Sequence, residues 1–533
     1  MGKVLKVRAS KHSGISELGN VRKLKRILPS VPLKAHNLAV ITMAVLISAC
    51  STPSGMSSKN PSLDIEHNSP KNWQTKQTQN SSKSIVVDDW LRSFNNQTLE
   101  QMVAYALVNN YQLRADSINL EIAKERLQVS AATDFPELSL AISNARRKQV
   151  TNDTSSYQTD ADISVDLSYE IDLWGKLSDE QNQNRLSYAA AQANYQQSKL
   201  TLVANISKAW FDLTQAQQLL NLYQERADNL QRNLVMIQSS YQLGLNDALD
   251  VYLTKNDVNQ ELARVAQQEQ TLKLQSRALE LLLGDYPYAK KVAEQELPFI
   301  ATDIDLGLPA QLLTRRADIQ ASWLELLALD AGLAVAHKQR FPSFNLNASV
   351  SDNATELNNL LDGGALAWSL LGNITTPLFN AGRLQSLEQQ AKLAVEQKEQ
   401  QYLQQVYQAF ADVENSISER ESLAQRYRYY LKAQENALAA EKLSFDQYLR
   451  GLVTYTTVLE SQRRSFDAQT TVIQLTNQLL QNRIEIYSAL GGDYLSVDNQ
   501  MATNSATSLA TNSVKQSQSL TPMSLTNSTS LEK

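Results

Sequence analysis

The chain has 533 residues, of which only 16 are glycine and 12 are proline, well below the usage of about 7% and 5% that is typical of proteins. So few turn residues exclude a succession of small, loop-rich domains and favour long elements. The formal net charge is −5, but residues 1–49 carry nine Lys and Arg residues against one Glu. The remainder holds 41 basic against 54 acidic residues, and it lacks the basic surface on which nucleic-acid binding depends.

The N-terminus has the pattern of a secretory signal peptide that ends at the single cysteine, Cys50. Basic residues precede the apolar run Leu38–Ile47, which is shorter than the about 20 residues that a membrane-spanning helix needs. Small residues stand directly before Cys50, and this arrangement resembles the lipobox of bacterial lipoproteins. We therefore expect Cys50 to be lipidated, with an ordinary signal peptide that contains a cysteine as the alternative. Ser51 replaces the aspartate that usually retains lipoproteins at the inner membrane, so the resemblance implies the outer membrane.

A helix is expected over about Gln97–Thr133, followed by two strands. Strict alternation of apolar and polar residues predicts a strand over 161–173, and a partner strand is expected at about 137–148 with an external loop over Arg147–Tyr157. Alternation over about ten residues, with one apolar and one polar face, is typical of a transmembrane β-strand between lipid and water. An ordinary sheet with one face packed on a core is the alternative.

Long intervals without glycine or proline follow, and the second half of the chain repeats them. Lys176–Leu243 and Arg383–Arg450 each have 68 residues, and Leu245–Leu283 and Leu452–Leu490 each have 39. The bounding glycines recur at a displacement of 207, which indicates an internal duplication. Apolar residues within the intervals step by three and four, as in a coiled coil, so a 68-residue interval predicts a helical rod of about 100 Å. The glycines between the intervals, Gly244 and Gly451, are then the turns of two helical hairpins.

The second copy repeats the elements ahead of its long helix. A helix is expected over about Ala310–Arg340, strands over 344–351 and 365–376, and an external loop over Asp352–Gly363. Four strands are too few for a closed membrane barrel, which starts at about eight. Open edges cannot face lipid because their backbone groups would stay unpaired. The barrel must therefore be shared, and the count alone permits two, three or four chains.

These features divide the chain into six segments. They are a lipoprotein signal peptide (1–49), a lipidated N-terminus and polar linker (50–85), a first repeat (86–285), a connector (286–308), a second repeat (309–495), and a Ser/Thr-rich tail expected to be disordered (496–533).

Residue types that carry catalysis are scarce. Beyond Cys50 the sequence has only His67 and His337 and no further cysteine, so it offers no histidine or thiol metal site. Its glycines are isolated at the ends of elements and form no phosphate-binding loop. We therefore expect neither an enzyme nor a bound cofactor.

Four short motifs stand out within the two repeats: Ser168–Lys176, Arg315–Ile319, Phe341-Pro342-Ser343 and Tyr448–Tyr455. Through these motifs, about 86–495 resembles the TolC-type outer-membrane efflux proteins, particularly the lipoprotein branch that includes OprM and NodT. Ala317, in the second motif, stands where the family usually has proline.

The resemblance implies a mainly helical fold with membrane strands, in which three chains share a 12-stranded β-barrel and a 12-helix α-barrel. It implies a passive exit duct for drugs, metals or other small molecules in the outer membrane. The implied partners are a periplasmic adaptor (membrane fusion) protein and an inner-membrane pump of the RND type. Two alternatives remain open: the outer-membrane duct of a type I protein-secretion system, and a periplasmic coiled-coil adaptor lipoprotein without a pore.

The resemblance also assigns roles to residues at the hairpin turns. The adaptor-docking tips match Leu243, Gly244 and Leu245 in the first hairpin and Arg450, Gly451 and Leu452 in the second. Asp250 aligns with a residue that links the tips when the channel is closed, and two gate aspartates fall on Thr457 and Glu460. Only Glu460 keeps the acid, and three copies of it around an axis would attract cations. Plain helix turns and solvated acidic faces are the alternatives.

Overall fold

The computed structural model describes Trp73 and residues 89–151, 154–245, 247–294, 296–298, 312–356 and 366–494. All of them belong to one compact unit, Gly55–Lys533. The expected signal peptide, Cys50 and the expected tail over 496–533 lie outside the described residues, as do the expected linker except Trp73 and the second part of the expected connector, from residue 299.

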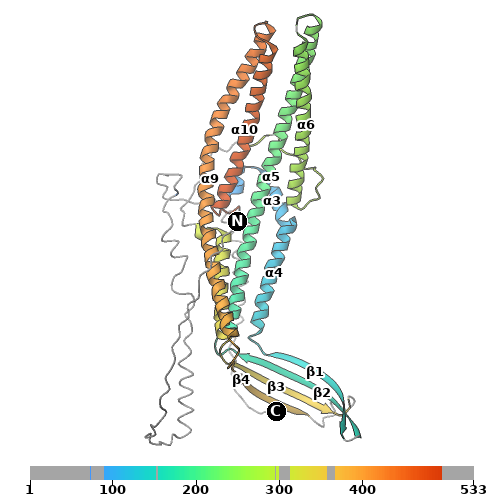
Figure 1. The fold of residues 1–533 in the computed structure, drawn as a ribbon, viewed down its shortest axis with the longest axis vertical. Helices are drawn as coiled ribbons and strands as arrows, with labels where there is room; N and C mark the ends of the chain where they lie inside the picture. Colours follow the sequence, from blue (N-terminus) through green and yellow to red (C-terminus); the bar gives the residue numbers. More distant parts are fainter. Residues whose placement is uncertain are drawn as a thin grey trace, which may run out of the picture. The chain divides into compact units, whose positions relative to one another are not determined.

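Two helical hairpins form the longest part of the described chain (Figure 1). The first consists of α5 (Lys176–Gln242) and α6 (Ala248–Leu283), and the second of α9 (Arg383–Leu449) and α10 (Tyr455–Ala489). The long helices end within one residue of the bounds that the glycine spacing predicts, which confirms that interpretation. In the first repeat α4 packs along α5, and in the second α8 packs along both α9 and α5.

The shorter helix of each repeat is broken, which the sequence did not predict. In place of single helices over Gln97–Thr133 and Ala310–Arg340, the structure has α3 (Gln97–Asn109) with α4 (Tyr111–Ala132), and α7 (Leu312–Arg315) with α8 (Ala317–Lys338). The breaks fall at Asn110 and Arg316, whose backbones are extended with ψ of 123° and 118°.

The two breaks make equivalent contacts in the two repeats. Asn110 accepts a hydrogen bond from Leu113 N and donates one to the carbonyl of Leu282, both at 2.8 Å. Arg316 donates to the carbonyl of Ala489, the residue 207 positions after Leu282, at 3.5 Å. A side chain thus ties each break to the last turn of the neighbouring hairpin helix.

The glycines that end the hairpins fit closely against these breaks. A Cβ atom on Gly284 would collide with the backbone of Asn109, and one on Gly491 would lie 3.0 Å from the backbone of Arg316. Both glycines also have positive φ, of 83° and 68°. The repeat of 207 residues in the glycine pattern therefore reflects one packing arrangement that is built twice.

Four antiparallel strands form one sheet in chain order (Figure 1). They are β1 (Glu137–Thr151), β2 (Thr154–Ile171), β3 (Ser343–Ala354) and β4 (Ala367–Thr375). The prediction of four strands is confirmed, but the external loop over Arg147–Tyr157 is wrong. That segment is a ribbon of β1 and β2, paired as far as Thr151 and Thr154, because antiparallel pairing continues through polar residues. The expected loop at 352–363 begins later than predicted, since β3 runs to Ala354; residues 357–365 lie outside the described part.

The register places most of the large apolar residues of the strands on one face; Leu371 of β4, which pairs with Asn347, lies on the other. One rung of the apolar face consists of Leu140, Val165, Val350 and Trp368, and the next rung, on the opposite face, consists of Ser139, Asp166, Ser349 and Ser369. In the single chain much of the apolar face is exposed, with Leu140 at 65% and Trp368 at 80%.

The main core lies where the N-terminal elements meet the two hairpins. The short helix η1 (Trp90–Phe94) supplies Trp90, which stacks on Tyr487 of α10 with ring centroids 5.7 Å apart. Phe94 packs against Phe211 of α5 in the same cluster. Helix α10 thus covers part of the short helix η1.

Among the described helices, α8 alone is long and apolar enough to cross a membrane, with a mean hydropathy of 1.3. It packs along α5 and α9, so its apolar residues contact the neighbouring helices.

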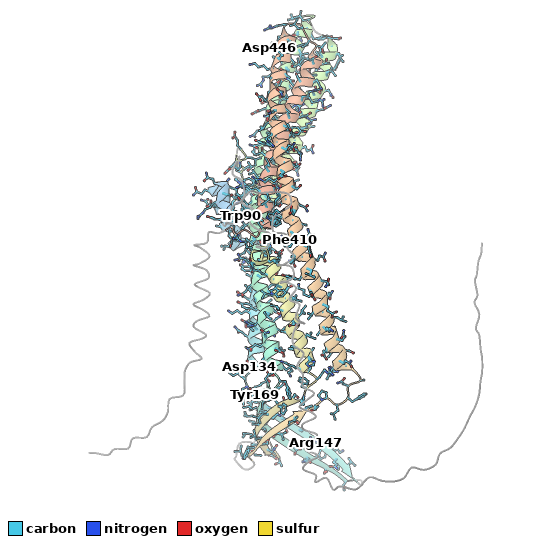
Figure 2. The ribbon with its side chains drawn as sticks, turned by 90° about the vertical axis from the view of Figure 1, so that its left-hand side faces the viewer. Trp90, Asp134, Arg147, Tyr169, Phe410 and Asp446 are labelled. Carbon is cyan, nitrogen blue, oxygen red and sulfur yellow. The ribbon has the colours of Figure 1, made fainter. Side chains whose placement is uncertain are left out.

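At the end of the helices that adjoins the sheet, Trp174 donates its indole N–H to the carbonyl of Pro342 at 2.7 Å, which joins two of the family-like motifs. The sheet begins at this junction, where Figure 2 shows Tyr169, and Arg147 lies at the end of the sheet remote from the helices.

Candidate functional site at the hairpin tips

The hairpin tips present apolar side chains to solvent. Leu243 and Leu245 flank Gly244 in the first tip and are 75% and 73% exposed, and Leu452 follows Gly451 in the second at 68%. Both glycines have a φ of 73°, and no atom lies within 4 Å of where their Cβ atoms would be. Their left-handed backbone therefore forms the turn, as expected, while the leucine side chains are mostly exposed in the single chain.

Directly behind the tips, an apolar cluster joins the two hairpins. Ile237 of α5 and Val251 of α6 pack against Tyr455 and Val458 of α10. Tyr455 is 1% exposed, and burial raises the pKa of its phenol to about 12. Tyr455, in the first turn of α10, therefore holds the second hairpin against the first.

The three expected gate residues lie next to or near this cluster in the sequence. Asp250 adjoins Val251, Thr457 adjoins Val458, and Glu460 lies one turn further along α10. Among the described residues, no hydrogen bond or ion pair joins any two of them. Burial and the nearby Asp247 raise the pKa of the Asp250 carboxyl.

Glu460 is not an isolated carboxylate. Arg463 donates to it at 2.9 Å and Arg464 at 2.8 Å, both from the same helix. These hydrogen bonds, from Arg464 and Arg463, lower the pKa of Glu460, so it is ionised and compensated at neutral pH. Sequence reasoning overlooked this compensation, although two arginines three and four residues after a glutamate are a recognisable signal.

A second set of contacts, both within the first hairpin and between the two hairpins, lies further from the tips. Gln462 of α10 donates to Asn229 of α5 at 3.4 Å. Arg226 of α5 lies 3.1 Å from Glu261 of α6, and its guanidinium carbon lies 4.8 Å from the ring centroid of Phe466 on α10. The described residues hold no group of three or more His, Cys, Asp or Glu side chains that could bind a metal ion.

Comparison with models of known protein families identifies the family to which the chain belongs. The model of the outer membrane efflux protein family matches residues 103–285 and 308–492, which is more than half of the chain and corresponds to its two repeats. The chain belongs to this outer-membrane family.

Individual relatives agree with the family match. The chain is 28% identical over 413 residues to the probable outer membrane lipoprotein SilC of Salmonella typhimurium, covering 76% of this chain and 88% of the relative. It is 28% identical over 427 residues to the toluene efflux pump outer membrane protein TtgF of Pseudomonas putida, covering 78% and 87%. It is also similar to the solved CmeC outer membrane channel of Campylobacter jejuni, with a TM-score of 0.76, 20% identity, and coverage of 82% and 95%.

The TolC-like fold expected from the sequence is thus confirmed. Within this outer membrane efflux protein, the hairpin turns lie where the glycine spacing predicts them. What sequence reasoning missed is the cluster around Tyr455, because contacts between helices more than 200 residues apart leave no local pattern.

Proposed function

We propose that this protein, as a homotrimer, forms the passive outer-membrane exit channel of an efflux system for drugs, metals or other small molecules. The observation that carries the proposal is the four-stranded sheet, in which every strand contributes apolar residues to one largely exposed face while the opposite face is mainly polar. An exposed apolar face of this size requires lipid or a partner, and alternation of this kind suits a barrel between lipid and water.

The open edges of the sheet support the sharing of the barrel. In the single chain β1 and β4 have no outer neighbours among the described strands, so each leaves a row of backbone groups unpaired. Pairing β4 of one chain with β1 of the next satisfies both edges in a closed ring. Three chains give 12 strands, the stoichiometry that the family resemblance implies. Chemical cross-linking in detergent tests this count, and a dimer or tetramer would contradict it.

The tips support the docking of further proteins. Exposed leucines on both hairpin turns suit a protein partner, and the proposed one is a periplasmic adaptor that links the channel to an inner-membrane pump of the RND type. We expect Leu243→Asp with Leu452→Asp to abolish efflux in cells while leaving the amount of trimer in the outer membrane unchanged. Lost trimer would instead indicate a folding role for these leucines.

The proposed anchor is Cys50, which lies outside the described residues. Its support is the lipobox pattern of the sequence, and two or three acyl chains would hold the protein at the membrane firmly. Substitution Cys50→Ser should abolish incorporation of labelled palmitate, and retained labelling would contradict the proposal.

The cluster behind the tips is proposed to keep the channel closed at rest. Truncating Tyr455 removes a fully buried side chain and about 3–5 kcal/mol of packing. Tyr455→Ala should therefore raise conductance in planar bilayers above that of the unmodified protein, whereas Tyr455→Phe, which keeps the ring, should not. Equal conductance in all three proteins would contradict a role of this cluster in closing the channel.

A deletion strain distinguishes small-molecule efflux from the type I secretion alternative. Increased susceptibility to antibiotics, dyes or metal salts supports efflux. Unchanged susceptibility together with a missing secreted protein supports secretion. A trimer that is extracted without detergent and does not conduct would support the adaptor alternative instead.

A further inference from the structure

The ribbon at the end of the sheet remote from the helices carries a basic cluster on one face. β3 pairs with β2 only as far as Ala354 and Ala161, so the β1–β2 ribbon extends past the other described strands. Three consecutive basic residues, Arg146, Arg147 and Lys148, lie in this extension. Consecutive residues of a strand point to opposite faces, so Arg146 and Lys148 share one face and Arg147 lies on the other.

The face of Arg146 and Lys148 is the apolar one. Leu138, Leu140 and Ile142, followed by Asn144, occupy the preceding alternate positions of β1. Tyr157 of β2 pairs with Lys148 and lies on the same face. The guanidinium carbon of Arg146 is 5.0 Å and the Nζ of Lys148 is 5.6 Å from the centroid of the Tyr157 ring, so the aromatic side chain holds both cations together.

This position corresponds to the lipid headgroups of the outer leaflet, given the barrel proposed above. Arg146 lies four residues past Ile142, about 13 Å along the strand, and the tilt of barrel strands reduces this to about 10 Å along the membrane normal. An exposed tyrosine beside long basic side chains is typical of a membrane interface. Among the described strand residues, the only acid on this face is Asp352, which is 5% exposed.

We propose that Arg146 and Lys148, gathered around Tyr157, bind phosphate groups of lipid A in the outer leaflet of the membrane. Lipid A is a phosphorylated glycolipid, and its phosphates lie directly above its acyl chains. A surface that combines an apolar face with cations at the upper edge of that face matches both parts of the molecule. Arg146 in particular can donate two parallel hydrogen bonds to one phosphate.

The test measures lipid binding to the full-length trimer in detergent by native mass spectrometry. The probes are hexa-acylated lipid A with two phosphates and the same lipid without phosphates. The double variant Arg146→Gln with Lys148→Gln should bind the phosphorylated lipid about tenfold more weakly than the unmodified protein. Arg147→Gln, which removes a neighbouring cation from the opposite face, is the matched control and should bind it normally.

Three results would overturn the proposal: unchanged affinity in the double variant, an equal loss in Arg147→Gln, or equal binding of the lipid without phosphates. Failure of the proposed channel is recognised separately. An unmodified protein that forms no trimer and does not conduct in bilayers overturns the barrel, and the lipid site with it. A conducting trimer whose affinity survives the double substitution overturns the lipid site alone.

Discussion

The Nε atom of Arg226 lies 3.1 Å from the carboxylate of Glu261, with only 11% and 2% of the two side chains exposed. The pair joins α5 to α6, and the ring of Phe466 on α10 covers the guanidinium. Removing one member of such a pair leaves a buried charge, so Arg226→Met should cost about 3 kcal/mol or more of unfolding free energy. Arg264, at 3.5 Å from Glu261 and half exposed, provides the control. Arg264→Gln should cost less than about 1 kcal/mol by denaturant titration in detergent.

Stability around this pair should increase as the pH falls from neutrality toward about 5. Burial raises the pKa of Asp257 and Glu261 on α6 and of Glu441 on α9, partly offset by Arg226. The folded chain therefore binds protons more tightly than the unfolded chain above the ordinary pKa values of 3.8 and 4.5, and stability is lost as the pH rises. The melting temperature of Asp257→Asn with Glu441→Gln should change less between pH 5.5 and 7.5 than that of the unmodified protein. An identical pH dependence in both proteins would contradict this assignment.

Alanine should be tolerated very differently at two glycines that share a left-handed backbone. Gly284 and Gly244 have φ of 83° and 73°, so alanine at either position costs about 1–2 kcal/mol in backbone strain. Only at Gly284 does the added methyl group also collide with a neighbouring backbone, that of Asn109. Thermal unfolding should therefore show a clearly larger loss for Gly284→Ala than for Gly244→Ala. Equal losses of stability would mean that the backbone at Asn109 and Asn110 shifts to accommodate the methyl group.

At the level of Leu140 and Ser139, charge should be tolerated on only one face of the sheet. Leu140→Arg places a cation on the proposed lipid-facing side, which costs about 2–4 kcal/mol near the middle of a membrane. Ser139→Arg places the same cation on the polar face, where water is available. The first variant should assemble poorly in the outer membrane and the second normally, as measured by the amount of folded trimer in that fraction. Similar yields of the two variants would argue against a membrane barrel.

Ion selectivity should depend on the partners of Glu460. Arg463→Gln with Arg464→Gln removes the hydrogen bonds that compensate the carboxylate, so the three Glu460 side chains of a trimer would favour cations. Glu460→Gln should shift selectivity in the opposite direction because the arginines remain. Reversal potentials across a KCl gradient in planar bilayers measure both. Unchanged potentials in both variants would place Glu460 outside the conduction path.

Much of this architecture follows from the spacing of glycines in the sequence. Glycine is needed wherever the backbone is left-handed or closely approached, so the turns at Gly244 and Gly451 and the ends at Gly284 and Gly491 were predictable. The breaks at Asn110 and Arg316 were not, because neither residue disrupts a helix by itself. Each break depends on a hydrogen bond to a carbonyl about 170 residues further along the chain, at Leu282 or Ala489.

The candidate site was predictable to a similar extent. Sequence reasoning located both tips, since their position depends on local chain geometry. It did not find that Tyr455 secures one hairpin to the other, which depends on contacts between distant helices. The segment Arg147–Tyr157 was misassigned as a loop because its polar and charged residues resemble a loop, whereas cross-strand pairing continues through it.

The stacking of Trp90 on Tyr487 has a consequence for the order in which the protein matures. The ribosome releases Trp90 almost 400 residues before Tyr487, so this part of the core stays uncovered until α10 has been synthesised. A chain exported N-terminus first therefore reaches the periplasm with this surface open. Periplasmic chaperones that shield aromatic residues should bind the emerging chain during this interval, and a truncation that removes α10 should leave it a lasting substrate for proteolysis.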